Sequence, residues 1–225
     1  MNILELCRQK ADATKTDCGQ EKDNNTIVND LQKFLSLAFM LVIPMDRART
    51  YYELELEKTF VYGIYSEGRF TPVSSMQDPS TAIWYIHLMP GDYKTGSIYG
   101  ECWTRMPNVQ FSDGQKLYEY IDRWLRDGRE YRHECNHNFF FRHSRNYNKL
   151  NSGDWTNRIK NLFEMETGMP VTPNEIRRMY VTYLNNQQAT NAELRGATSA
   201  MHNSQNILDS IFIYASGLTV GFENL

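Results

Sequence analysis

Basic and polar residues gather at the start of a predicted helix in the last quarter of the chain. Residues 171–178 read Val-Thr-Pro-Asn-Glu-Ile-Arg-Arg. Pro173 suits the first turn of a helix, and Asn174 and Arg177 lie three residues apart, so they share one face near its N-terminus. The N–H groups at a helix N-terminus attract anions, and a guanidinium group binds phosphate through its fork of donors. The spacing therefore favours a phosphate contact at this helix.

The segment that follows completes a longer pattern. After a helical stretch the chain reads Ala-Met-His-Asn-Ser, which contains His202 and Asn203, and then Ile-Phe-Ile-Tyr, which ends at Tyr214. This order resembles the C-terminal active-site half of tyrosine recombinases, the phage-integrase family. That family shows a His-x-x-Arg box, a Leu-Gly-His-Ser turn and a nucleophilic tyrosine. The resemblance covers roughly residues 31–214 and assigns Arg177 to the arginine of the box.

The resemblance implies DNA strand breakage and rejoining through a covalent phosphotyrosine, without a metal or other cofactor. In the family, two arginines hold the non-bridging phosphate oxygens, a hairpin lysine protonates the leaving hydroxyl, and histidines assist. Such a set suits the chemistry, because forked cations stabilise the extra negative charge of a phosphorane more than that of the substrate. The implied partner is double-stranded DNA, with a homo-oligomer assembled on it for recombination or integration.

The first arginine and the lysine of the family pattern have candidates in the N-terminal half. Arg49 follows an apolar stretch and precedes Glu53, as the family's first arginine does before its acidic residue, and Arg47 is the alternative. The family places the acidic residue three positions after the arginine, whereas Glu53 stands four after Arg49. Lys94, in Asp-Tyr-Lys-Thr-Gly-Ser, is similar to the hairpin lysine and would deliver the proton to the leaving group.

The histidine and tyrosine positions depart from the family pattern. Asn174 stands at the first histidine, where an amide can donate a hydrogen bond but cannot pass on a proton. Aligning the turn puts Asn203 at the second histidine and Phe212 in the tyrosine slot, with His202 and Tyr214 as the nearest substitutes. Two interpretations follow. Either the chain is a strand-exchange enzyme with Tyr214 as nucleophile, or it is a catalytically degenerate DNA-binding or regulatory protein that keeps the recombinase fold.

A second group of residues has metal-ligating side chains. His133, Cys135, His137 and His143 lie close together in the sequence. Their spacing matches no usual zinc finger, and a polar loop that leads into a strand at residues 138–141 explains them better. A metal-dependent nuclease built on this cluster is a third hypothesis, and we expect no metal in the site.

The elements that must position these residues make an α+β fold that is mainly helical. Residues 1–25 predict a polar, loose N-terminal arm, and residues 26–225 an integrase-like catalytic domain with a small antiparallel sheet among its helices. In this interpretation the DNA-clamping domain that precedes the catalytic domain in the family is missing or reduced to the arm. Apolar residues at helical spacing, with Asn25 or Thr26 as cap, predict a first helix that ends near Pro44.

Strands and further helices follow from the patterns of apolar and turn residues. Residues 60–65 and 82–88 predict strands, and residues 93–100 predict a short strand or hairpin. Helices are predicted at residues 51–56, 113–126, 155–167, 173–183, 192–201 and 206–214. Gly168 is expected to close the helix that precedes it.

Bulk properties leave these interpretations open. The 225 residues are 41% hydrophobic and 23% charged, with a formal net charge of −3, which argues against indiscriminate coating of nucleic acid. Residues 116–180 carry a mild basic excess, twelve Lys and Arg against nine Asp and Glu. The sequence shows no secretory signal and no apolar run long enough for a membrane, so we expect a cytoplasmic protein. Four scattered cysteines predict free thiols.

Overall fold

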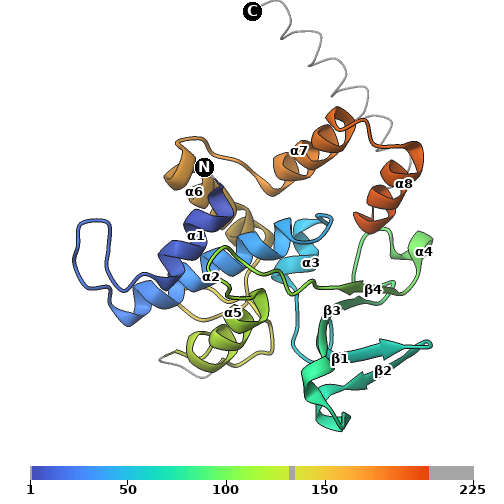
Figure 1. Cartoon of the computed structure of the whole chain (residues 1–225), viewed down its shortest axis with the longest axis horizontal. Helices are drawn as coiled ribbons and strands as arrows, with labels where there is room; N and C mark the ends of the chain where they lie inside the picture. The colour runs from blue at the N-terminus through green and yellow to red at the C-terminus, as the bar shows by residue number, and fades with distance from the viewer. Residues whose placement is uncertain (1, 132–134, 203–225) are drawn as a thin grey trace, which may run out of the picture.

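The computed structural model describes residues 2–131 and 135–202. Its helices are α1 (Ile3–Asp12), α2 (Asn24–Leu41), α3 (Ala48–Tyr52), α4 (Gly96–Tyr99), α5 (Leu117–Arg123), α6 (Ser152–Thr167), α7 (Pro173–Asn186) and α8 (Asn191–Ala200). Its strands are β1 (Phe60–Ser66), β2 (Arg69–Pro72), β3 (Ile83–Leu88) and β4 (Cys102–Arg105). Figure 1 shows α1, α2, α5 and α6 gathered on one side and the sheet on the other, with α8 close to α4 and β4. The fold is therefore α+β with a small sheet.

Helix α2 forms the centre of the core. Its N-terminus is capped by Asp23, whose carboxylate accepts from the N–H of Thr26, rather than by Asn25 or Thr26 as the sequence predicted. The predicted apolar face is confirmed, since Leu31, Phe34 and their neighbours down the helix are buried. None of the described helices is both long and apolar enough to cross a membrane.

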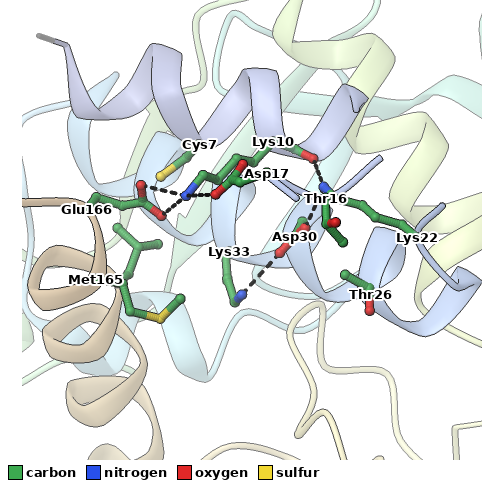
Figure 2. A pocket seen from close by; sticks show the side chains of 11 residues that line it. Cys7, Lys10, Thr16, Asp17, Lys22, Thr26, Asp30, Lys33, Met165 and Glu166 are labelled. Carbon is green, nitrogen blue, oxygen red and sulfur yellow. Dashed lines mark hydrogen bonds and ion pairs between the residues drawn. The ribbon is translucent and has the colours of Figure 1, made fainter. Parts of the chain in front are cut away.

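The N-terminal residues do not form the loose arm predicted from their polarity. Helix α1 packs on α2, with Cys7 and Ala11 buried. A hollow between α1, α2 and α6 contains several lysines that are all paired: Nζ of Lys10 lies 2.8 Å from Glu166 of α6, and Nζ of Lys22 lies 2.9 Å from Asp30 (Figure 2). This segment has few apolar residues, so ion pairs supply many of the contacts that fix it to α2 and α6.

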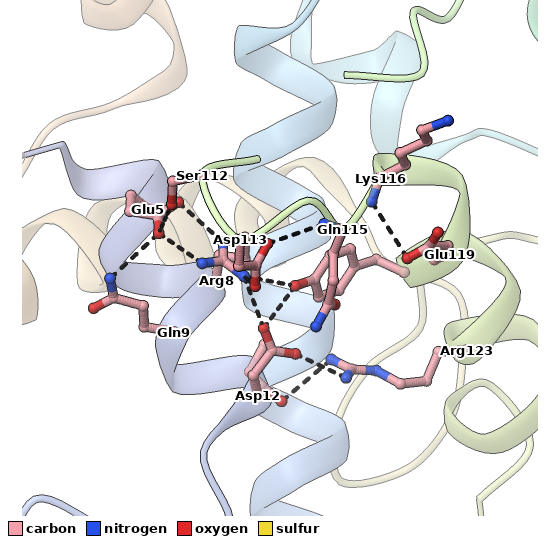
Figure 3. A network of polar contacts seen from close by, with 12 residues as sticks. Glu5, Arg8, Gln9, Asp12, Ser112, Asp113, Gln115, Lys116, Glu119 and Arg123 are labelled. Atoms are coloured by element: carbon pink, nitrogen blue, oxygen red, sulfur yellow. Dashed lines mark hydrogen bonds and ion pairs between the residues drawn. The ribbon is translucent and has the colours of Figure 1, made fainter. Parts of the chain in front are cut away.

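A second network fixes α1 to α5 and to the loop that precedes it. The buried Arg8 guanidinium donates to Glu5, Asp12, Asp113 and the hydroxyl of Tyr120 (Figure 3). Three carboxylates and a phenol thus surround one buried cation. Their hydrogen bonds offset the free energy that is lost when the guanidinium is removed from water. This network makes α1 part of the folded body.

The sheet is antiparallel and has the strand order β2-β1-β3-β4. Strands β1 and β3 confirm the two predicted apolar runs. The predicted strand or hairpin at residues 93–100 is wrong, because this segment forms a turn and the short helix α4 instead. Gly96 allows the compact turn, since a Cβ there would lie 2.0 Å from the carbonyl oxygen of Pro90. The fourth strand begins only at Cys102.

The C-terminal helices largely follow the prediction. Helix α6 ends at Gly168, whose φ of 75° is the left-handed conformation expected of a C-terminal glycine. Helix α5 is shorter than predicted and continues as a π-helical turn, Trp124–Gly128. The predicted strand at residues 138–141 is reduced to an isolated bridge between Glu55 and Phe139. The helix predicted at residues 206–214 lies outside the described residues.

Candidate functional site

The loop after α2, the stretch from residue 95 to residue 102 and helix α7 meet around the turn that follows α8. The Thr95 hydroxyl, just before α4, donates to the carbonyl oxygen of His202 at 2.7 Å. The Arg177 guanidinium of α7 donates to the carbonyl oxygen of Met201 at 3.1 Å. Asp46, in the loop after α2, and Cys102, at the start of β4, both contact the His202 ring. The turn is therefore held from the sheet side and from α7 together.

His202 has a left-handed backbone, with φ 49°. This conformation commonly ends a helix and is usually occupied by glycine. The preceding residue, Met201, is buried and its N–H bonds the carbonyl oxygen of Ala197, which closes α8. The left-handed turn directs the His202 side chain into the protein, where only 3% of the residue is exposed.

The His202 ring lies between an acid and a thiol. Its Nδ1 lies 2.7 Å from Oδ2 of Asp46 and its Nε2 lies 3.1 Å from Sγ of Cys102. Burial would lower the pKa of His202, but the bonds to Asp46 and Cys102 outweigh it and raise the pKa to about 9. Burial disfavours the Cys102 thiolate, yet hydrogen bonds from His202 and Thr104 leave its pKa below the ordinary value. The arrangement favours a thiolate–imidazolium pair.

Asp46 is held firmly in place. Its Oδ2 accepts from the Thr50 hydroxyl at 2.7 Å and its Oδ1 from the N–H of Arg47 at 2.6 Å. Its own N–H donates to the hydroxyl of the buried Tyr51. On the other side, the rings of Tyr93 and Tyr99 lie 4.4 and 5.9 Å from the His202 ring, centroid to centroid. The acid and the imidazole are thus fixed by their surroundings.

Two arginines belong to the same cluster. Burial lowers the pKa of the Arg177 guanidinium; the Asp46 carboxylate opposes this, and the positive charge of Arg47 lowers it further. Arg47 is therefore close enough to Arg177 for their charges to interact. The Nε of Arg47 is buried and has no hydrogen-bond partner among the residues that the structure describes.

Arg49, the first arginine predicted from the sequence, points elsewhere. Its side chain is 51% exposed and its Nε donates to Glu53 at 2.6 Å. It lines a hollow together with Lys58, Lys149 and Asp92. The contacts thus favour the alternative, Arg47, as the arginine that accompanies Arg177.

The other predicted site residues are placed as follows. Lys94 is exposed and precedes Thr95 in the loop before α4, so it is near the cluster in the chain but does not lie in a β-hairpin. Asn174 is exposed in the first turn of α7. Asn203, Phe212 and Tyr214 lie outside the described residues.

The histidine and cysteine group in the loop after α5 is engaged in local contacts. Sγ of Cys135 donates to the carbonyl oxygen of Arg129, and a ring nitrogen of His137 lies 3.0 Å from the carbonyl oxygen of Tyr147. His143 accepts from the N–H of Arg145. His133 lies outside the described residues. Within residues 2–131 and 135–202, no three His, Cys, Asp or Glu side chains are grouped to hold a metal ion.

Sequence reasoning missed Asp46 and Cys102. Asp46 directly precedes Arg47 after the apolar helix, a weak signal because such a pair is common at helix starts. Cys102 carried no signal, since it stands alone and outside any motif. Both acquire a role only through contacts with His202, which is 156 and 100 residues away in the chain, respectively.

No model of a protein family matches the chain, and neither does any curated protein or any solved structure.

Proposed function

We propose that this protein breaks and rejoins DNA strands through a covalent phosphotyrosine, in the manner of tyrosine recombinases, with Arg47 and Arg177 at the scissile phosphate. The observation that carries the proposal is that Arg177 binds the Met201–His202 turn while the charge of Arg47 acts on Arg177, since the resemblance requires these three segments to be neighbours. The positive charges of Arg47 and Arg177 repel each other, and a bound anion would relieve that repulsion.

The turn supplies a second argument. In the alignment of residues 201–204 with Leu-Gly-His-Ser, His202 takes the place of the glycine, and its backbone has the left-handed φ that glycine adopts readily. Asn203 then follows at the position of the second histidine. Thr95 binds the turn through the carbonyl oxygen of His202, which brings the loop that carries Lys94 to the same place.

Each residue has a stated role in the proposed reaction. Arg47 and Arg177 hold the non-bridging oxygens and stabilise the charge that develops on them. Lys94, exposed beside the cluster, protonates the leaving hydroxyl. Tyr214 attacks phosphorus, and Asn203 donates a hydrogen bond to the phosphate. His202, fixed by Asp46, positions the turn from which the chain continues to Tyr214.

The test is the covalent intermediate itself. The full chain is incubated with a pool of duplexes that carry a randomised core and nicks beside it, so that the cleaved fragment diffuses away and the adduct accumulates. We expect a protein–DNA band that survives denaturing electrophoresis, is lost in Tyr214→Phe and persists in Tyr183→Phe, whose tyrosine is exposed on α7. An absent band, or one that Tyr214→Phe leaves unchanged, contradicts the assignment.

One observation favours the second candidate, a degenerate member that binds DNA without cutting it. The Asp46 carboxylate lies in the cluster and acts on Arg177, which is only 9% exposed. A buried carboxylate next to the arginines competes with phosphate for them. Retained binding to a labelled duplex, steeply weakened by salt and without any covalent band, would support this candidate over the enzyme.

A further inference from the structure

We propose that Cys102 is a modification site, a nucleophilic thiol activated by His202 and Asp46 that hydrogen peroxide oxidises to sulfenic acid. This inference does not depend on the proposed DNA chemistry, because it concerns the thiol of Cys102, which has no role in that chemistry. Nothing in the sequence pattern pointed to it.

The geometry is that of an activated nucleophile. A thiol becomes reactive when a base lies within hydrogen-bond reach and a third group orients that base. Nε2 of His202 lies 3.1 Å from Sγ of Cys102, and the Asp46 carboxylate holds the opposite nitrogen at 2.7 Å. Thr104 adds a second contact to Sγ at 3.7 Å. Cys102 is half-buried at the start of the edge strand β4, so a small electrophile can reach it.

The other cysteines provide contrasting environments. Cys7 is buried between helices, and burial raises the pKa of its thiol to about 12. Burial also raises the pKa of Cys135. Cys18 is exposed in the loop between α1 and α2, where access is free. Cys102 is the cysteine that combines partial access with a hydrogen bond from an imidazole, which is the environment of reactive thiols.

The reaction balances with peroxide as the oxidant. The thiolate sulfur attacks one peroxide oxygen, an S–O bond forms as the O–O bond breaks, and hydroxide leaves. The imidazolium of His202 gives its proton to that hydroxide, so one water forms. Sulfur loses two electrons and the peroxide gains them. Added dithiothreitol restores the thiol, since sulfenic acid is the reversible step of cysteine oxidation.

Oxidation has a local consequence, because a neutral sulfenic acid replaces the anion that faces His202. His202 has given its proton to the leaving hydroxide, so a neutral imidazole faces Asp46 and the ion pair between them is lost. The groups around this ring are Asp46, Cys102, Tyr93, Tyr99 and, through Asp46, Arg177. The hold on the Met201–His202 turn therefore weakens, and any activity that depends on this turn becomes sensitive to peroxide.

The test compares cysteines within one full-length protein. The chain is treated at pH 7 with hydrogen peroxide and dimedone, or with limiting iodoacetamide, and labelling of each cysteine is followed by peptide mass spectrometry. We expect Cys102 to be labelled at least about tenfold faster than the more exposed Cys18, because the hydrogen bond from His202 favours the Cys102 thiolate. Equal or slower labelling of Cys102 overturns the proposal.

Two further measurements separate activation from simple access. His202→Gln and Asp46→Asn are expected to slow labelling of Cys102 while that of Cys18 is unchanged; unchanged Cys102 labelling in a folded variant contradicts the role of the pair. If a variant does not fold, the wild-type pH profile decides. The rate at Cys102 should level off at a lower pH than the rate at Cys18, and coincident profiles would overturn the proposal.

Discussion

Two buried clusters of charged residues join separate elements of this fold, and they differ in whether their groups can gain or lose a proton near neutral pH. In one, Arg8 of α1 is surrounded by Glu5, Asp12 and Asp113. In the other, the ring of His202 lies between one carboxylate and one thiol. The first cluster joins α1 to α5, and the second joins the end of α8 to the sheet and to the loop after α2.

The two clusters differ in the pKa values of their groups. The hydrogen bond from Arg8 holds the pKa of Glu5 at about 2, and the carboxylates raise the pKa of Arg8 above its already high value. Glu5 and Arg8 therefore keep their charges near neutral pH. The pKa of His202 is raised to about 9 and that of Cys102 is lowered, so the contact between them favours the charged form of each. A compensated arginine stabilises a fold, whereas an acid–imidazole–thiol line can also do chemistry.

Breaking the first cluster should have the largest effect on stability. Arg8→Met keeps the length of the side chain but leaves three carboxylates facing one another, and we expect a loss of about 3 kcal/mol in the free energy of unfolding. Urea denaturation measures it. The control is Arg126→Met, an exposed arginine paired with Asp127, which should change little. Equal effects of the two substitutions would show that the Arg8 network is not structural.

The second cluster should respond to pH where the first does not. The folded-state pKa of His202, about 9, lies above the ordinary 6.5, so its protonation stabilises the fold fully below pH 6.5 and this stability is lost as the pH rises through 9. The Cys102 thiolate has the opposite sign, because its lowered pKa gives stability that is lost as the pH falls. Asp46→Asn should cost about 2 kcal/mol at pH 6.

The same substitution should cost less at pH 9.5, where His202 is largely neutral in both proteins. Urea unfolding of wild type and Asp46→Asn at the two pH values measures the difference. Arg8→Met serves as the control, since its cost should be similar at both. A cost of Asp46→Asn that does not change with pH would mean that His202 is neutral in the folded protein.

The two clusters also mark the limit of prediction from this sequence. Helices α2 and α6 and strands β1 and β3 were predicted because their apolar residues recur with a local period that the sequence displays. Helix α1 was mistaken for a loose arm, because the burial of Arg8 depends on Asp113 and Tyr120, more than a hundred residues away. Ion pairs of this kind have no sequence period.

The residues of the candidate site also fall into those that a local motif predicts and those that only contacts between distant segments reveal. Arg177 was predicted because Thr-Pro-Asn-Glu-Ile-Arg is a local motif, with a proline to start the helix and an arginine on its first turns. Arg49 is preferred to Arg47 because it follows an apolar stretch and precedes Glu53, although the spacing to Glu53 is one residue too long. In the structure it is the charge of Arg47 that acts on Arg177, and this proximity of two distant segments has no signal in the sequence. Asp46 and Cys102 gain their role from the left-handed turn at His202, which the sequence did not indicate.

The smallest expected effect is on the affinity for DNA. It tests whether the His202 cluster, unlike the Arg8 cluster, can bind a phosphate. All the carboxylates around Arg8 compete with phosphate, whereas Arg47 keeps a buried Nε without a hydrogen-bond partner in the described part of the chain. Arg47→Ala should therefore weaken binding to a labelled duplex by about fivefold and lower the salt slope by about one, as expected for one lost phosphate contact. Fluorescence anisotropy across a salt series measures both.

Arg49→Ala is the matched control for this last prediction, because it removes an arginine two residues away that is exposed and already paired with Glu53. We expect a smaller change in affinity for Arg49→Ala than for Arg47→Ala. The reverse order would restore Arg49 as the first arginine of the site, as its place in the sequence suggested. It would also mean that the cluster around His202 resembles the Arg8 network more than a phosphate site, with Arg47 and Arg177 serving the fold alone.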